Sequence, residues 1–110
     1  MKKEAPATTA KRLRKYITKR HRRLIIALLI GPLPRETADR VAGASNSPHH
    51  IRELRDNFHL SIRTERVEKI DRDGHPTRPG IYHLEKESFK LAELLVSPAP
   101  VETDDEDKGG

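Results

Sequence analysis

Cationic side chains are concentrated at the start of the chain. Residues 1–23 contain ten lysines and arginines against one acid, residues 24–96 contain eleven of each, and residues 97–110 contain one lysine and five acids. Guanidinium and ammonium groups at this density attract a polyanion, and each phosphate that they neutralise makes binding more sensitive to salt. Nucleic acid is the first candidate partner, and an anionic membrane surface is the second. The side chains that we expect to contact phosphates are Arg12, Lys15, Lys19, Arg20, Arg22 and Arg23.

A second group of polar side chains follows a helical spacing in "SPHHIRELRDNF". Ile51, Leu54 and Phe58 lie three and four residues apart, which predicts a helix over about residues 48–57 with one apolar face. Ser47, which precedes a proline, is expected to cap it. Two histidines and two arginines are left outside, where arginine can bond O6 and N7 of guanine in a major groove. The predicted DNA contacts of this helix are Ser47, His49, His50, Arg52 and Arg55.

The alternative for these residues is a solvated helix face. Arg52 and Asp56 would then form an ion pair one turn apart, worth about 0.2–0.5 kcal/mol. His49 and His50 diverge by about 100° around a helix, and no two histidines are spaced four apart, so we expect no zinc site. Protonation of the two histidines below about pH 6.5 would add positive charge to the helix. We favour DNA contact.

The stretch "IDRDGHPTRPGIYHL" predicts a β-hairpin whose tip is charged on both sides. Asp73-Gly74 favours a tight turn, and alternation in "GIYHL" favours Tyr82 and Leu84 as the inward pair over Ile81 with Leu84. A calcium loop is disfavoured because the third acidic ligand and the closing glutamate are missing. The tip could reach a DNA backbone or minor groove, but its acids make a plain surface hairpin an equal alternative. The predicted contacts of the tip are Arg72, His75, Thr77 and Arg78.

Serine, histidine and aspartate side chains are all present, but they form no catalytic motif. The sequence has no nucleophile elbow, no phosphate-binding glycine loop and no carboxylate pair, and it has no cysteine to act as a nucleophile or zinc ligand. We therefore expect no enzyme activity and no cofactor. The longest apolar run, Leu24–Ile30, is far shorter than the roughly 20 residues of a membrane span. We expect a buried helix there, no membrane insertion and a cytoplasmic location.

Helix-ending residues divide the first half of the chain. Leu13, Ile17, Leu24 and Leu28 lie near one helical face, and whether they belong to one helix or two stays open. Gly31 and the proline after it end that segment. A second short helix is expected between "PRE" and "VAG", and the helix of "SPHHIRELRDNF" follows it.

The second half of the chain changes to a strand-like period. "LSIRTERVEKI" predicts a strand with one bulge that shifts its inward face, and "KESFKLAELLV" predicts a last helix. A chain of 110 residues can build one core. We predict four segments: a disordered N-terminus (1–8), a basic helical arm (9–19), a folded domain (20–96) and a disordered acidic tail (97–110).

Three helices, a β-hairpin and a last helix form the plan of a winged helix-turn-helix. Over about residues 20–95 the chain resembles phage- and prophage-type winged helix-turn-helix proteins, a loosely defined family of small DNA-binding regulators. The resemblance rests on "GPLPRETADRVAG", "IRELRDNFHLSI" and "DRDGHPTRPGIYHL". It implies a mainly α fold with a small β-hairpin, that is, a three-helix core, a two-stranded wing and a C-terminal helix. It also implies sequence-specific binding of double-stranded DNA by a small transcriptional regulator.

Such regulators commonly dimerise to span two half-sites, and the C-terminal helix is the best candidate for a homodimer surface. Two other functions stay open. One is a protein-protein interaction module that presents the near-neutral third helix to a host or phage protein. The other is an RNA-binding or membrane-surface arm on an inert domain, although Tyr16 is the one aromatic residue among the basic residues and stacking on single strands is not expected.

Overall fold

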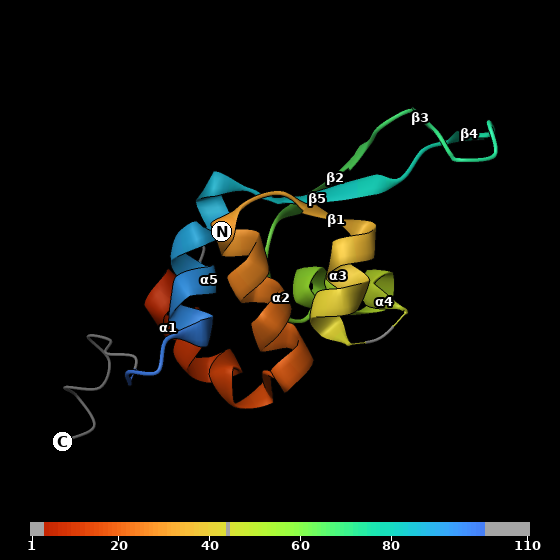
Figure 1. Cartoon of the computed structure of the whole chain (residues 1–110). Helices are drawn as coiled ribbons and strands as arrows, with labels where there is room; N and C mark the ends of the chain where they lie inside the picture. The colour runs from red at the N-terminus through yellow and green to blue at the C-terminus, as the bar shows by residue number, and fades with distance from the viewer. Residues whose placement is uncertain (1–3, 44, 101–110) are drawn as a thin grey trace, which may run out of the picture.

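Helices pack against a small antiparallel sheet in the computed structural model of the chain, which describes residues 4–43 and 45–100 (Figure 1). The helices are α1 (Pro6–Leu13), α2 (Lys19–Ile30), α3 (Arg35–Ala42), α4 (Ser47–Asp56) and α5 (Phe89–Val96), with 3₁₀ turns η1 (Arg14–Tyr16) and η2 (Lys86–Ser88). The strands are β1 (Leu33–Pro34), β2 (Ile62–Arg66), β3 (Lys69–Ile70), β4 (Pro76–Thr77) and β5 (Gly80–Leu84). The predicted combination of helices and a β-hairpin is confirmed. The fold is nevertheless mixed α/β rather than mainly α, because a third strand joins the sheet in the order β1-β5-β2.

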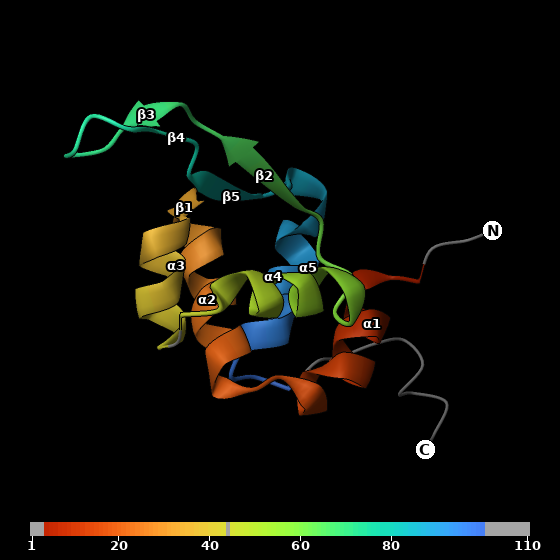
Figure 2. The ribbon, with the colours of Figure 1, turned by 90° about the vertical axis from the view of Figure 1, so that its right-hand side faces the viewer.

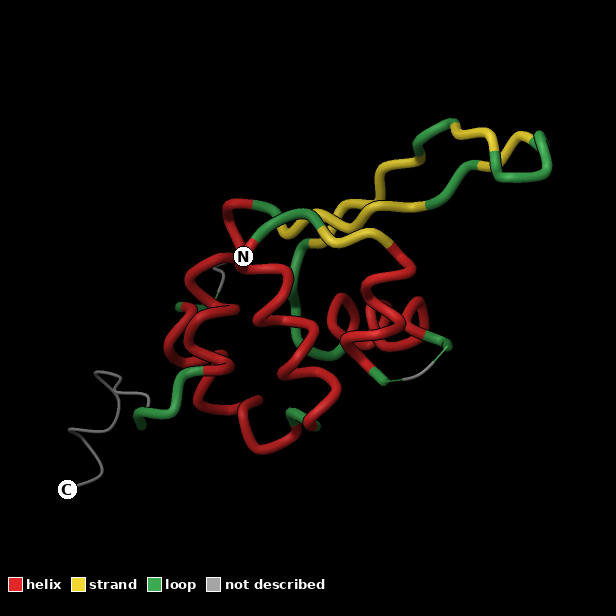
Figure 3. Tube along the Cα trace, viewed as in Figure 1, coloured by secondary structure: helices red, strands yellow, loops and turns green. Residues whose placement is uncertain are grey.

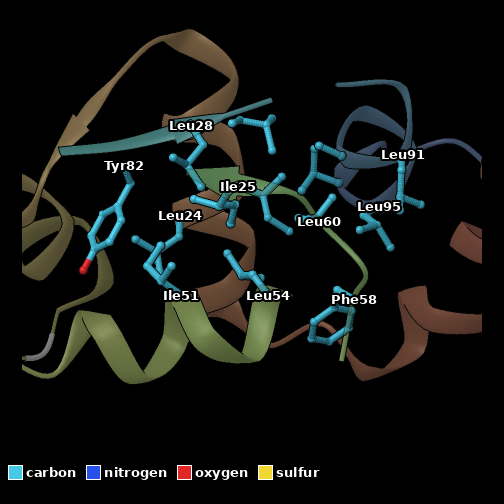
Figure 4. Packing of buried hydrophobic residues seen from close by; sticks show 14 of the residues in the cluster. Leu24, Ile25, Leu28, Ile51, Leu54, Phe58, Leu60, Tyr82, Leu91 and Leu95 are labelled. Carbon is cyan, nitrogen blue, oxygen red and sulfur yellow. The ribbon is translucent and has the colours of Figure 1, made fainter. Parts of the chain in front are cut away.

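One hydrophobic core lies between the helices and the sheet (Figure 4). α2 supplies its centre with Leu24, Ile25 and Leu28, and Ile51 and Leu54 approach from α4. Full burial of a side chain of this size stabilises the fold by about 1.5–3 kcal/mol relative to leaving it exposed. Every α-helix contributes buried residues, so the core fixes how α4 stands on the rest of the molecule.

α1 belongs to the folded body. Its Pro6 stands at the first helical turn, where no amide partner is needed, and Thr9, Ala10 and Leu13 are buried. α1 packs against α5, from the other end of the chain (Figure 1). The helix therefore begins inside the stretch that we expected to be disordered, of which residues 1–3 lie outside the described part. Residues 9–19 form parts of α1, η1 and α2 rather than a separate arm.

Two helices, not one, occupy the first 30 residues. The chain turns through η1, and α2 begins after Thr18, whose hydroxyl accepts a hydrogen bond from the backbone N–H of His21 at 3.1 Å. The His21 ring accepts one in return, at Nδ1, from the Thr18 N–H at 3.1 Å. Such a reciprocal pair satisfies two amides that the helix itself cannot. This capping box settles the question that the spacing of apolar residues left open.

α3 and α4 are joined by a short turn that begins at Gly43. Gly43 has a φ of +73°, a conformation that glycine adopts without strain at a helix end. Ser47 is the first residue of α4 rather than its cap, and its backbone N–H donates to Asp39 Oδ1 at 3.1 Å. The predicted capping role of the Ser47 hydroxyl is therefore wrong, because the Asp39 carboxylate of α3 takes that role.

β1 is a strand that the sequence did not predict, and β4 is another. Leu33 pairs with Tyr82 and Pro34 with Ile81, at the edge of the sheet where a residue without an N–H is tolerated. Tyr82 and Leu84 are buried while Ile81 is partly exposed, which confirms the inward pair that alternation favoured.

The hairpin of β2 and β5 continues into β3 and β4 and extends beyond the helical body (Figure 3). Both ladders share one register, with two residues on each strand between them. No strand carries an extra residue, so the predicted bulge is wrong. The Val67 N–H donates to the Pro79 carbonyl at 3.1 Å, and the ladder is interrupted there because Pro79 has no N–H to return.

α5 buries Leu91, Ala92, Leu95 and Val96, and it packs against α1 and α2. The helix that we expected to offer a homodimer surface is therefore largely covered within its own chain, with Phe89 as an exposed apolar residue at its start. No helix within residues 4–43 and 45–100 has both the length and the apolar character required to cross a membrane.

Candidate nucleic-acid interface

α4 and Asn46, the N-cap residue just before it, expose one continuous stripe of polar side chains. Asn46, His49, Arg52 and Asp56 follow one another at intervals of three, three and four residues, and all are exposed. The opposite side of the helix carries the buried Ile51 and Leu54. Figure 2 shows α4 across the front of the molecule, beside α3 and below the sheet. We call these four residues the α4 stripe.

The two arginines of α4 have different surroundings. Arg52 is exposed and makes no hydrogen bond or ion pair with any residue in the described ranges, so the alternative pair with Asp56 is not formed there. Arg55 is half-buried and donates to the Ile62 carbonyl at 2.8 Å and to Thr64 Oγ1 at 2.7 Å. Arg52 is thus available to a ligand, whereas Arg55 joins α4 to β2.

Ser47 and His50 do not lie on the stripe. Ser47 is buried, and its hydrogen bonding holds the pKa of Asp39 below its usual value. The His50 side chain is 12% exposed, and its Nδ1 lies 3.2 Å from Glu53 Oε1. Of the five predicted contacts of this helix, the structure places His49 and Arg52 where a ligand could reach both.

Three histidines surround Glu53 at the contact between α2 and α4. His21 Nε2 lies 3.0 Å from Oε1, His50 Nδ1 lies 3.2 Å from the same oxygen, and His49 Nε2 lies 3.6 Å from Oε2. The His21 ring also packs edge-on against Phe58, with 4.9 Å between ring centroids. The bond from His21 is the main reason that the pKa of Glu53 is lowered, although partial burial acts in the opposite direction.

The donor atoms of His21, His50 and Glu53 are close enough together to be tested as a metal site. His21 Nδ1 accepts from the Thr18 backbone N–H, so the neutral ring carries its proton on Nε2, the atom that faces Glu53. A metal bound to Nε2 would move that proton to Nδ1, where the N–H of the ring would face the Thr18 backbone N–H and the hydrogen bond between them would be lost. The cluster therefore fits a hydrogen-bonded tie between helices better than a zinc site.

Arg20 and Arg23 bind the carboxyl end of α3. Arg20 Nε donates to the Ala42 carbonyl at 3.2 Å, and Arg23 donates to the Val41 carbonyl at 2.8 Å and to that of Ala42 at 3.0 Å. Carbonyls at a helix end lack partners within the helix and favour nearby cations. These two arginines consequently lie beside the turn that leads into α4.

Arg22 and Arg14 bind the carboxyl end of α5 in the same way. Arg22 Nη1 donates to the Val96 carbonyl at 2.5 Å, and Arg14 donates to the carbonyls of Ser97 and, at 2.6 Å, Ala99. Arg22 was predicted to contact phosphate, and its structural role could not be foreseen because the acceptor is 74 residues away.

The other three predicted phosphate contacts do not bind the ends of α3 or α5. Arg12 forms an ion pair with Glu4 at 2.6 Å, and its hydrogen bond is the main cause of the lowered pKa of Glu4. The Lys15 ammonium stands 5.4 Å from the centre of the Tyr16 ring. Lys19 is exposed at the start of α2 and makes no hydrogen bond or ion pair within the part of the chain that the structure describes.

The acids at the hairpin tip have a structural role. Asp71 Oδ1 accepts the backbone N–H groups of Asp73 at 2.9 Å and His75 at 2.8 Å, and Gly74 has a φ of +84°. Asp71 also donates its own N–H to the His75 carbonyl, so the turn that contains Asp73-Gly74 spans three residues. The Arg72, His75 and Arg78 side chains are left exposed, while Thr77 bonds the Lys69 carbonyl at 3.3 Å.

Asn46 in the stripe and His21 beneath it were not among the predicted site residues. Asn46 is the N-cap of α4, and its place directly before Ser47 and Pro48, at the predicted start of the helix, could have indicated it. His21 had no such indication, because its partner Glu53 is 32 residues away.

Comparisons with protein-family models, with curated proteins and with solved structures find no match to this chain.

Proposed function

We propose that this chain is a winged helix-turn-helix protein that binds double-stranded DNA with α4 in the major groove, and that it acts as a small transcriptional regulator of the phage or prophage type. The observation that carries the proposal is the α4 stripe, in which Arg52 is exposed and without a partner among the described residues. The order of α2, α3, α4 and the β2–β5 hairpin supports it, since it is the order expected of that class.

A major groove about 12 Å wide admits an α-helix, and the chemistry of the stripe suits base edges. Arginine forms paired bonds with guanine, and asparagine forms them with adenine. In this proposal Arg52 and Asn46 read bases, with His49 between them. Asp56, at the far end of the stripe, excludes phosphate by its charge and restricts contact to the amino-terminal part of α4.

The cations beside the start of α4 supply the contact to phosphates. Arg20 and Arg23 use some of their N–H groups on the end of α3, but a guanidinium has five. They place positive charge next to the turn before α4, where a DNA strand bordering the groove would pass, and Lys19 adds an exposed cation at the start of the same helix, α2. On the other side the hairpin tip supplies Arg72 and Arg78.

A protein-interaction module is the second candidate, and the charge balance favours it. The α4 stripe contains one arginine and one aspartate, and residues 65–79 of the hairpin hold four cations and four acids. A near-neutral surface of this kind suits a protein partner better than a polyanion.

A fluorescence anisotropy titration with a random 20-base-pair duplex at 50 and 200 mM salt separates the two candidates. We expect micromolar binding at 50 mM that weakens about tenfold or more at 200 mM, because phosphate contacts release counterions. Absence of binding at 50 mM salt would exclude the DNA-binding proposal.

A further inference from the structure

A small basic hollow lies where the described chain ends. It has a volume of about 220 Å³ and is lined by Arg14, Ile17, Thr18, Lys19, Arg22, Leu95 and Ser97. Three of the lining residues are cations and none is an acid. All three cations come from residues 1–23, which hold ten lysines and arginines against one acid. We call this site the basic hollow. Its charge fits an anionic occupant.

The chain passes along the rim of the basic hollow just before residue 101. Arg22 holds the Val96 carbonyl at 2.5 Å, and Arg14 holds the carbonyls of Ser97 and Ala99. These bonds fix the point from which the following segment starts. That segment reads "VETDDEDK" and carries five acids within residues 102–107.

The length of the acidic segment is sufficient for it to turn back onto the hollow. Seven extended residues, 101–107, span up to about 23 Å, which is about twice the diameter of a helix with its side chains. The Lys19 ammonium makes no hydrogen bond or ion pair within the described residues, and the guanidinium groups of Arg14 and Arg22 have N–H groups beyond those bound to carbonyls.

We propose that residues 102–107 occupy the basic hollow and the cationic surface around it, and thereby compete with the phosphates of DNA. The contact itself does not depend on the proposed function, whereas its regulatory effect rests on that function. Lys19 is shared between the two partners, because the proposed function assigns it to phosphates and it also lines the hollow. A bound acidic segment lowers the positive charge that α2 presents next to α4.

The competition acts mainly on non-specific binding. A tethered segment has an effective concentration in the millimolar range, so a contact with a dissociation constant below about 1 mM occupies the hollow most of the time. It then weakens a duplex held by a few phosphate contacts, with dissociation constants of about 10⁻⁴–10⁻⁶ M. A duplex that also engages the α4 stripe binds more tightly and displaces the segment. The acidic segment consequently widens the difference between specific and random duplex.

Nuclear magnetic resonance of the full chain without DNA tests the contact. The variant carries Glu102→Gln, Asp104→Asn, Asp105→Asn, Glu106→Gln and Asp107→Asn. We expect amide shifts at residues 17–22 and 95–97 and none at the hairpin tip, and a Lys19→Gln background should reduce these shifts. Unchanged amide positions at residues 17–22 and 95–97 would overturn the contact.

DNA titrations test the regulatory effect separately. At 50 mM salt the five-substitution variant should bind random duplex about fivefold more tightly than the wild type, and the difference should vanish at about 500 mM, where exposed charges are screened within about 5 Å. Asp104→Asn with Asp105→Asn should give an intermediate gain. The control for this two-substitution variant is Glu87→Gln with Glu93→Gln. It changes the net charge by the same amount but removes acids of η2 and α5.

Each result has one meaning. An equal gain in the control and in the Asp104/Asp105 variant would overturn docking as the cause, because net charge alone would explain it. Amide shifts without a gain in DNA affinity would overturn the regulatory part and leave the contact established. A wild type and a five-substitution variant that both fail to bind DNA at 50 mM would refute the proposed function, while the amide shifts still decide whether the segment docks.

Discussion

His21 Nε2 and Glu53 Oε1 lie 3.0 Å apart and tie α2 to α4. The tautomer of His21 is fixed by the Thr18 backbone N–H at Nδ1, so Nε2 is the donor and the Glu53 carboxylate the acceptor. Through this bond the helix that opens with a capping box also determines where α4 stands.

Replacing Glu53 by glutamine should lower stability at neutral pH. Its hydrogen bonds from His21 and His50 are made to a charged, partly buried group, and we expect a loss of about 1–2 kcal/mol in the free energy of unfolding at pH 7, measured with urea. Glu36→Gln, at an exposed site, is the control and should change stability by less than about 0.5 kcal/mol.

The effect of Glu53→Gln should depend on pH in a defined direction. Hydrogen bonds donated by His21 and, to a smaller extent, by His50 lower the pKa of Glu53 in the folded state. The carboxylate therefore stabilises the fold above the usual glutamate pKa of 4.5 and ceases to do so as the pH falls through the lowered folded value. The wild type and the variant should therefore approach each other in stability between pH 5 and about pH 3. If the difference in the free energy of unfolding stays constant over this range, the charge of Glu53 does not stabilise the fold.

A double-mutant cycle with His21→Ala and Glu53→Gln should reveal coupling between α2 and α4. The two side chains are in direct contact, and we expect an interaction energy of about 0.5–3 kcal/mol from thermal or urea unfolding of the four proteins. His83→Ala with Glu53→Gln is the comparison pair, since His83 bonds Glu65 on the hairpin instead. Additive effects in the first pair would mean that the His21–Glu53 bond contributes nothing net.

Arg55 and Arg52 should separate stability from binding. Arg55→Ala removes donors from the Ile62 carbonyl and Thr64, and we expect a loss of about 1–2 kcal/mol in urea unfolding. Arg52→Ala should change stability by less than about 0.5 kcal/mol, because the side chain is exposed. Equal stability losses would contradict the different surroundings of the two arginines.

Lys19→Gln should weaken binding to all duplex sequences alike. Loss of one phosphate contact reduces the slope of log affinity against log salt by about 0.9, which a titration at four salt concentrations measures. Lys86→Gln, on η2, serves as the control and should leave the slope unchanged. A sequence-dependent effect of Lys19→Gln would assign this residue to base reading instead.

Helix ends were predictable because their residues act locally. Gly43 ends α3 in the left-handed conformation, and α2 ends at an extended Gly31 that is followed by a proline. The inward pair Tyr82 and Leu84 follows from strand alternation. The two-residue strand β1 shows no period, since its partner β5 lies almost 50 residues later. The bulge was inferred from a change of apolar face after Thr64. In the structure the register of the two strands is continuous there, and only the ladder of hydrogen bonds is interrupted, at Pro79.

The candidate site was only partly predictable, because contacts between residues far apart in the sequence leave no local pattern. Exposure of His49 and Arg52 follows from the helical period of Ile51 and Leu54. The use of Arg22 and Arg23 at two helix ends could not be foreseen, because their acceptors are backbone carbonyls of distant helices. The sequence can show where a helix ends, but it does not show which distant arginine will bind the carbonyls there.

The most direct test of DNA reading by α4 compares Arg52→Gln with Lys90→Gln on a duplex selected from a randomised pool by the wild-type chain. Lys90 is exposed on α5, away from the α4 stripe, and its substitution removes the same charge. In anisotropy titrations we expect Arg52→Gln to lose about tenfold or more in affinity and Lys90→Gln to stay within about twofold of the wild type. Equal affinities of the two variants for the selected duplex would contradict a role for α4 in reading DNA.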